Sequence, residues 1–315
     1  MVIIMLKKFY LIGFIGVIVM FSILLSACGN STDNNSKKNK NGTTKTELGQ
    51  EKLTMPYVSW ASTVAGVNVM KAVLEDTGYK IDLKQVSPGV VFASLADGSA
   101  DISVGTVTLP TTHADYWNKY KDQLEDLSVS MKKEVTIGLV VPSYVNIDSI
   151  EDLKKNTNNI GDKLDWTITG IDPGAGQMEI TENEVMPKYG LNKWDLQSSS
   201  DSAMTAALKK AIDAHEPIVV TLWEPHWAFL KWDLKYLDDP DNLFGDPDSL
   251  HAVSRQGLEK DAPAANRILK QFHWTAKDMG EVMVMINDGM DPYEAGKKWV
   301  KDNPDKVSEW TKGVK

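Results

Sequence analysis

Two short and almost entirely apolar runs constrain the fold of this chain most: VTIGLVV at residues 135–141 and IVVTLW at residues 218–223. Runs of this length without alternating polar residues are typical of β-strands that helices cover on both faces. The remaining pattern predicts further strands at 52–60, 81–86, 101–104 and 166–171, and helices at 65–77, 91–95, 177–186, 202–214 and over most of 261–310. Pro187 is expected to stop the third of these helices. Alternation of strands and helices predicts an α/β fold with mainly parallel sheets.

The N-terminal residues read as a targeting segment. Lys7 and Lys8 precede an apolar stretch at 9–25, and Leu-Ser-Ala-Cys closes it at 25–28. This tetrapeptide resembles a bacterial lipobox, which implies a lipoprotein signal peptide at 1–27 and a lipid-modified Cys28. The open alternatives are retention as a membrane span and an ordinary signal followed by a buried cysteine. Residues 28–50 are nearly free of apolar side chains and predict a flexible tether, so we expect the body to be lipid-anchored at the outer face of the cell membrane.

Composition excludes several functional classes. The net charge of −9 argues against nucleic acid as a partner. A single cysteine excludes a disulfide framework and a multi-thiolate metal site. The histidines show no metal-binding spacing, and no nucleophile–base motif is recognisable, so we expect neither a cofactor nor an enzyme. The competing hypothesis, a lipid-anchored hydrolase on an α/β scaffold, requires a nucleophile at a strand end. With 315 residues, the chain is long enough for two lobes.

Tryptophans occupy those strand ends instead. Trp60 ends the strand at 52–60, and Trp223 ends the strand at 218–223. In open α/β sheets, ligands bind outside the carboxyl ends of the strands. Aromatic faces at that position attract a cation such as a quaternary ammonium group. The alternative is that both tryptophans only fill the core.

A glycine-rich turn, IDPGAGQ at 171–177, joins a predicted strand to a predicted helix. Its backbone N–H groups and the positive end of the helix suit an anion. The turn lacks the motifs of phosphate-binding loops, so a small carboxylate fits it better than a polyphosphate, although such turns are often only turns. An aromatic cage together with a carboxylate site describes a zwitterion such as a betaine.

Several stretches of the chain resemble the substrate-binding proteins of glycine betaine ABC importers. They are YVSWASTVAGVNV (57–69), LPTTHADYW (109–117), ITGIDPGAGQM (168–178), IVVTLWEPHWAF (218–229), KYLDDPDNLFG (235–245) and the C-terminal AGKKWVKDNPDKVSEWTKGV. This resemblance implies a two-lobed binding protein of the periplasmic, class II type, which closes on its ligand at a hinge. We expect one lobe from 51–140 together with 252–315, and the other from 141–251.

The resemblance also implies roles for individual residues. In the family, three tryptophans box the trimethylammonium group; two match Trp60 and Trp223, and the third falls at Thr108, which has no aromatic ring. Another aromatic residue could compensate, the cage could be weaker, or the ligand could differ; the candidates for compensation are Phe92, Trp117 and Trp227. The ligand carboxylate is expected at His113 and at the backbone amides of Gly176 and Gln177, with the Gln177 side chain adding a polar group near the ligand.

These features together predict an extracellular receptor without catalytic activity. We expect it to capture glycine betaine or a related quaternary ammonium osmolyte and to deliver it to an ABC permease and its ATPase. Carnitine, choline or a sulfonium analogue remains an alternative ligand. Choline lacks the carboxylate, so dependence on His113 would separate it from the betaines.

Overall fold

The computed structural model of the protein describes residues 48–314. The predicted signal peptide, Cys28 and nearly all of the predicted tether lie outside this range. Between residues 48 and 314, no helix combines the length and apolar character needed to cross a membrane.

The strands form two sheets. The smaller pairs β1 (Lys52–Tyr57) with β2 (Lys80–Gln85) in parallel. The larger has the order β3 (Ile102–Leu109), β9 (Asp248–Arg255), β4 (Leu124–Pro142), β7 (Val220–Glu224), β5 (Thr167–Thr169) and β6 (Asp195–Gln197), with β8 (Leu234–Tyr236) also paired to β4. The parallel pairs of this sheet are those of β5 with β6 and with β7; β4 and β9 pair with all their neighbours in antiparallel fashion. The prediction of mainly parallel sheets is therefore wrong, because β4 and β9 run in opposite directions through the middle of the sheet.

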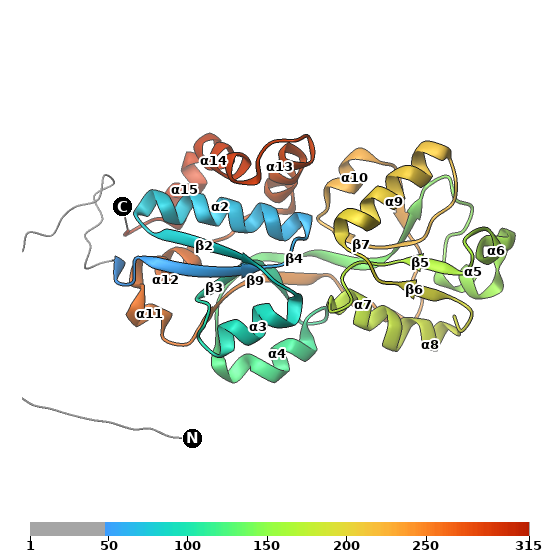
Figure 1. Ribbon diagram of the computed structural model, residues 1–315, viewed down its shortest axis with the longest axis horizontal. Helices are drawn as coiled ribbons and strands as arrows, with labels where there is room; N and C mark the ends of the chain where they lie inside the picture. Colours follow the sequence, from blue (N-terminus) through green and yellow to red (C-terminus); the bar gives the residue numbers. More distant parts are fainter. Residues whose placement is uncertain (1–47, 315) are drawn as a thin grey trace, which may run out of the picture. The chain divides into compact units, whose positions relative to one another are not determined.

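The long strand β4 changes partners along its length. Residues 124–135 pair with β9, and the pairing passes to β7 at Thr136, which faces Glu224. Figure 1 shows β4 running from the group of elements around β9 to the group around β5 and β7. The sequence predicted only the apolar half at 135–141. The first half mixes buried, half-buried and exposed residues without a regular period and carries Lys132, Lys133 and Glu134, so it lacks the signal of a fully buried strand.

Helices follow most strands. Those that precede β5 are α2 (Ala61–Thr77), α3 (Pro88–Ala96), α4 (Ala114–Tyr120), α5 (Ile150–Lys155) and α6 (Ile160–Lys163), with short 3₁₀ turns at Lys121–Gln123 and Thr157–Asn159. Those after β5 are α7 (Gly176–Ile180), α8 (Met186–Tyr189), α9 (Asp201–Ala214), α10 (Trp227–Lys231), α11 (Leu258–Asp261), α12 (Pro263–Gln271), α13 (Ala276–Asn287), α14 (Pro292–Asp302) and α15 (Pro304–Trp310). Helix α2 packs against α13 and α14 (Figure 1).

Pro187 does not stop the helix that precedes it, as the sequence had predicted. A π-helical turn, Thr181–Val185, links α7 to α8, and Pro187 lies in the first turn of α8, which continues to Tyr189. Proline is tolerated there because a first-turn N–H has no partner within its own helix.

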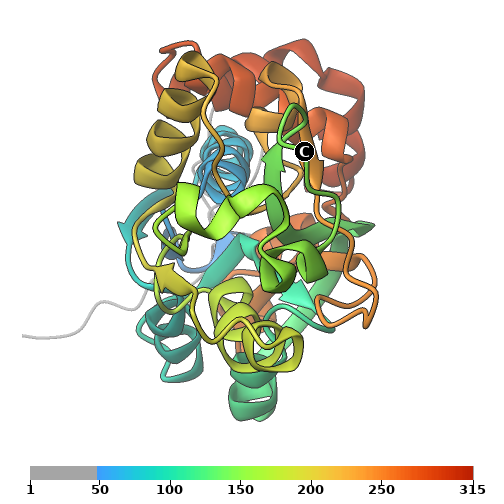
Figure 2. The ribbon, with the colours of Figure 1, turned by 90° about the vertical axis from the view of Figure 1, so that its right-hand side faces the viewer.

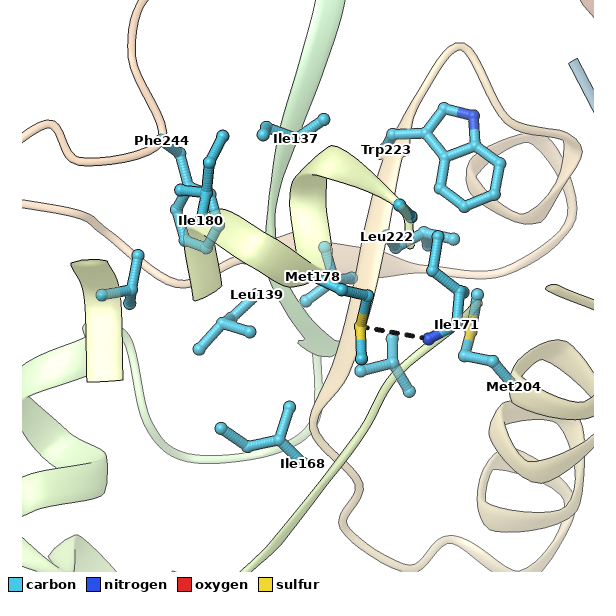
Figure 3. Packing of buried hydrophobic residues seen from close by; sticks show 14 of the residues in the cluster. Ile137, Leu139, Ile168, Ile171, Met178, Ile180, Met204, Leu222, Trp223 and Phe244 are labelled. Carbon is cyan, nitrogen blue, oxygen red and sulfur yellow. Dashed lines mark hydrogen bonds between the residues drawn. The ribbon is translucent and has the colours of Figure 1, made fainter. Parts of the chain in front are cut away.

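Two hydrophobic clusters hold the elements together. One joins α2, β1 and β2 to the C-terminal helices and contains Trp274, Trp299 and Trp310. The other centres on β4, β5 and β7, at the end of the molecule that Figure 2 views. Figure 3 shows part of this second cluster, in which Leu139 and Leu222 of the sheet lie near Met178 of α7 and the Met178 sulfur accepts the N–H of Ile171 at 3.3 Å. Trp223 lies at the edge of this cluster, so the ends of β5 and β7 and the start of α7 are fixed by packing.

Candidate ligand-binding site

A small cavity of about 50 Å³ lies where β3, β7 and the starts of α2 and α7 meet. Its lining includes all six residues predicted to contact a ligand: Trp60, Thr108, His113, Gly176, Gln177 and Trp223. A water molecule needs roughly 10–15 Å³ of such space, so the cavity as it stands has room for a few waters or a very small solute. The structure thus brings together residues that are up to 163 positions apart in the chain.

Trp60 occupies the position just before the first residue of α2. Its backbone is extended, with φ −84° and ψ 142°, which turns the chain from β1 into the helix. The indole Nε1–H donates to Asp172 Oδ2 at 2.9 Å. The loop after β5, 112 residues further along the chain, therefore fixes the orientation of the ring. The ring stacks on His113, with centroids 6.1 Å apart and an interplanar angle of 26°.

Trp223 points from β7 into the same cavity. Its Nε1–H donates to Ser62 Oγ at 3.2 Å, which ties β7 to the first turn of α2. The ring centroids of Trp60 and Trp223 are 6.3 Å apart, and the ring planes are inclined by 58°. Both indole N–H groups are therefore used by the protein, and the π-faces are left as the groups that a ligand can contact.

His113 presents a free donor. Its Nδ1 accepts the backbone N–H of Thr108 at 3.2 Å, so the neutral ring carries its proton on Nε2. Within the described chain, Nε2 is buried and has no hydrogen-bond partner. Burial lowers the pKa of His113 to about 4, an effect larger than the opposing influence of the Asp248 carboxylate. At neutral pH the site therefore contains an uncharged imidazole with one unused N–H, which is a costly arrangement unless a ligand accepts it.

The loop before His113 is held by one buried carboxylate. Asp248 Oδ1 accepts the N–H of Thr111 at 2.9 Å, and its Oδ2 accepts the N–H of Thr112 and the Thr112 hydroxyl, each at 2.7 Å. These bonds fix the path of the chain from β3 to α4 and so the position of the His113 ring.

Helix α7 brings its first two amides to the cavity. In the part of the chain that the structure covers, the N–H groups of Gly176 and Gln177 have no acceptor, as is usual in the first turn of a helix. Gly176 must be glycine, because a Cβ there would lie 1.7 Å from the carbonyl oxygen of Thr112. The side chain of Gln177 does not contribute a free donor, since its Nε2 donates to Gly138 O at 3.1 Å and to Leu222 O at 3.0 Å.

The position of Thr108 is not filled by another aromatic ring. Over residues 48–314, none of the compensating candidates Phe92, Trp117 and Trp227 is among the cavity-lining residues. Phe92 instead packs behind His113, with ring centroids 5.7 Å apart. Aliphatic side chains share the lining with Thr108, including Val135, Leu250 and Met279.

Sequence reasoning missed three polar side chains of the lining, those of Ser62, Thr106 and Thr112. Ser62 is hydrogen-bonded to Trp223, and Thr112 to Asp248. Thr106 lies two residues before Thr108 on β3, and its buried hydroxyl makes no hydrogen bond to any residue in the described range. Two residues separated by one other point to the same face of a strand, so the position of Thr108 could have indicated Thr106. The cavity therefore has two orphaned side-chain donors, Thr106 Oγ1 and His113 Nε2.

Comparison with known families identifies the chain. Residues 51–302 match the model of the substrate-binding domain of ABC-type glycine betaine transport systems. The chain belongs to this family. The family predicted from the sequence is thereby confirmed.

Relatives within and near this family share the fold. Lactococcal OpuAC, solved in a closed conformation with glycine betaine, is 40% identical, with a TM-score of 0.77 over 83% of this chain and 100% of that one. A choline-binding protein of an ABC transporter, solved with choline, is 26% identical, with a TM-score of 0.78 over 84% of this chain and 93% of that one. These matches confirm the predicted α/β fold of the periplasmic-binding-protein type.

A curated relative is the glycine betaine/carnitine transport binding protein of Listeria monocytogenes serotype 1/2a (strain 10403S). It is 52% identical over 165 residues, which make up 52% of this chain and 54% of the relative. The alignment thus spans about half the length of that protein.

Proposed function

We propose that this protein captures a small zwitterion with a quaternary ammonium group and a carboxylate, first of all glycine betaine, for an ABC permease and its ATPase. The observation that carries the proposal is the pairing of opposite requirements in one cavity. Two tryptophan rings, with centroids 6.3 Å apart, suit a cation without N–H groups, and the His113 Nε2–H beside them, which has no partner among residues 48–314, suits an anion.

Each end of the ligand has its own contacts in this proposal. Trp60 and Trp223 bind the trimethylammonium group, and each ring contributes about 0.5–2 kcal/mol depending on desolvation. His113 Nε2–H and the amides of Gly176 and Gln177 bind the carboxylate. Thr106 adds a hydroxyl donor that the sequence alone did not suggest.

The site closes between two lobes in this account. We place one lobe at 51–140 together with 252–315 and the other at 141–251; the change of partners along β4 near Thr136 supports a connection close to that boundary. Contacts between the two sets of residues surround the cavity. They are Trp60 with Asp172, Ser62 with Trp223, and the Tyr116 hydroxyl with the carbonyl of Gly174 at 3.1 Å. Closure removes water from the ligand, which strengthens both the cation–π and the hydrogen-bond contacts.

Carnitine, choline and sulfonium analogues are the alternatives within this class. With threonine at position 108, the cation faces two aromatic rings instead of the three of the family's tryptophan box. This difference favours a ligand that makes additional contacts with other parts of the site. The carboxylate contacts at His113 favour a betaine over choline, because choline would leave Nε2–H unpaired.

The proposal also covers the attachment of the protein to the membrane and the absence of catalysis. Cys28 carries a lipid that anchors the protein at the outer face of the cell membrane, and the protein performs no catalysis. The ends of β1 and β7, where a hydrolase of this scaffold would carry its nucleophile, are followed or occupied by Trp60 and Trp223.

Calorimetric titration of the purified chain with glycine betaine, carnitine, choline and proline tests the proposal. Saturable binding of betaine, weakened in Trp223→Ala, supports it. Binding of choline alone would contradict the carboxylate site. Binding of none of the four would refute the ligand class.

A further inference from the structure

A buried carboxylate links the two segments that carry the cage tryptophans. Asp201 is the first residue of α9 and is 5% exposed. Its Oδ2 accepts the backbone N–H of Ala61 at 2.8 Å, and its Oδ1 lies 3.2 Å from Nε2 of His226. Ala61 directly follows Trp60 in the chain.

His226 completes the connection to the second tryptophan. Its Nδ1 accepts the N–H of Ala228 at 3.1 Å, so Nε2 carries the proton and donates it to Asp201. The imidazole is fully buried and packs edge-on against Trp223, with centroids 4.8 Å apart and an angle of 81°. One oxygen of Asp201 thus holds the segment of Trp60, and the other holds a ring that supports Trp223.

We propose that Asp201 is a positioning residue that assembles the aromatic cage when the lobes close and that slows release of the ligand. This inference rests on the proposed function and on the proposed lobes. Asp201 and His226 belong to residues 141–251, and Ala61 to the other lobe, so the bond from Ala61 N–H to Asp201 exists only while the lobes are together.

The hydrogen bond from Ala61 N–H to Asp201 is placed so that it acts as a latch, that is, it stabilises the closed arrangement of the lobes. The N–H of Ala61 is one of the amides at the start of α2, a helix of 17 residues, that have no acceptor within the helix, and a carboxylate is the acceptor that such an end favours. Hydrogen bonds to a charged group stabilise more than neutral ones. Opening the lobes would expose both partners to water, so the latch acts on the closed state and has no counterpart in the open one.

Ala61→Pro removes the donor with little disturbance elsewhere. Proline suits the first position of a helix, and the extended backbone of Trp60 suits the residue before a proline. The proline ring also occupies the space in front of the nitrogen, so Asp201 Oδ2 must withdraw from its present distance. Asp201→Asn is the second variant and removes one of the two carboxylate oxygens.

Ala276→Pro is the matched control. Ala276 is also the first residue of a helix, α13, and its N–H also donates to a carboxylate, Glu134 Oε2 at 2.8 Å. Both of these partners lie in the same proposed lobe, so the control loses the same kind of bond without affecting closure.

The test is the dissociation rate of glycine betaine, followed by tryptophan fluorescence in stopped flow with the full chain. We expect Ala61→Pro and Asp201→Asn to raise this rate by about 10- to 100-fold with an unchanged association rate, while Ala276→Pro leaves it unchanged. A purely structural role would instead lower the melting temperature of the ligand-free protein and spare the dissociation rate, and that result overturns the inference. If the unmodified chain does not bind betaine at all, the proposed function itself is refuted.

Discussion

His113→Asn isolates the contact that defines the carboxylate end of the site. The shorter asparagine side chain can place its amide oxygen where Nδ1 now accepts the N–H of Thr108, but it has no group at the position of Nε2. The substitution therefore deletes one donor, which is buried and unpartnered among the described residues, and preserves the bond that orients the loop.

The magnitude follows from the kind of bond that is lost. A hydrogen bond from a neutral donor to a buried carboxylate contributes about 1.5–3 kcal/mol, so we expect glycine betaine to bind about 10- to 150-fold more weakly. Isothermal titration calorimetry at pH 7 measures this directly. At that pH the ring is neutral in the unmodified protein, because its pKa is about 4, so the comparison involves a donor and not a charge.

Choline provides the internal control for this experiment because it has the cation and no carboxylate. Any choline affinity should not fall in His113→Asn, and it should rise if the unpaired Nε2–H disfavours choline in the unmodified protein. The reasoning is refuted if betaine affinity is unchanged in a folded variant, or if betaine and choline lose affinity in equal proportion.

Three further predictions concern the same cavity. Gly176→Ala should weaken betaine binding by about 10-fold or more in calorimetry, because the new Cβ would lie 1.7 Å from Thr112 O, which belongs to the other proposed lobe, and would oppose their approach. Thr106→Val should weaken betaine about 2- to 10-fold and at the same time raise the midpoint of urea unfolding, because it removes an unsatisfied buried hydroxyl; parallel losses of both would contradict the role of Thr106. The free energy of unfolding should fall by about 3 kcal/mol between pH 6.5 and pH 4 through His113, because the unfolded chain binds a proton in this window that the folded chain, with its lowered pKa, does not. Urea titrations should show that His113→Asn lacks this part of the decline.

The sequence located the site better than it described the sheet. Trp60 and Trp223 were predictable because strand ends and aromatic side chains are local signals. The turn at 171–177 was predictable because its glycines are apparent in the sequence itself. Thr106 was missed because a threonine within an apolar strand has no distinctive pattern, and only burial without a partner marks it. The roles of Asp201 and His226 could not be predicted, since they depend on contacts between residues 25 to 140 positions apart.

The fold, like the site, was predictable from local signals and not where it depends on contacts between distant segments. The apolar run at 135–141 identified a buried strand, yet its extension back to Leu124 was hidden because most residues of that half are exposed or half-buried, with no regular alternation. Antiparallel pairing of β4 with β9 joins segments more than 100 residues apart. The hydrophobic pattern of a strand does not indicate in which direction its neighbours run. Pro187 did not end the helical segment because it lies in the first turn of α8, where a proline is tolerated.

The measurement that tests the central claim most directly compares glycine betaine with tert-butylacetate by calorimetry. The two molecules have the same shape and the same carboxylate, but the second carries carbon in place of the quaternary nitrogen and therefore no positive charge. If the faces of Trp60 and Trp223 select a cation, betaine binds and tert-butylacetate binds at least about 10-fold more weakly. Equal affinity for the two would contradict the account, because the cavity would then recognise only shape and the carboxylate.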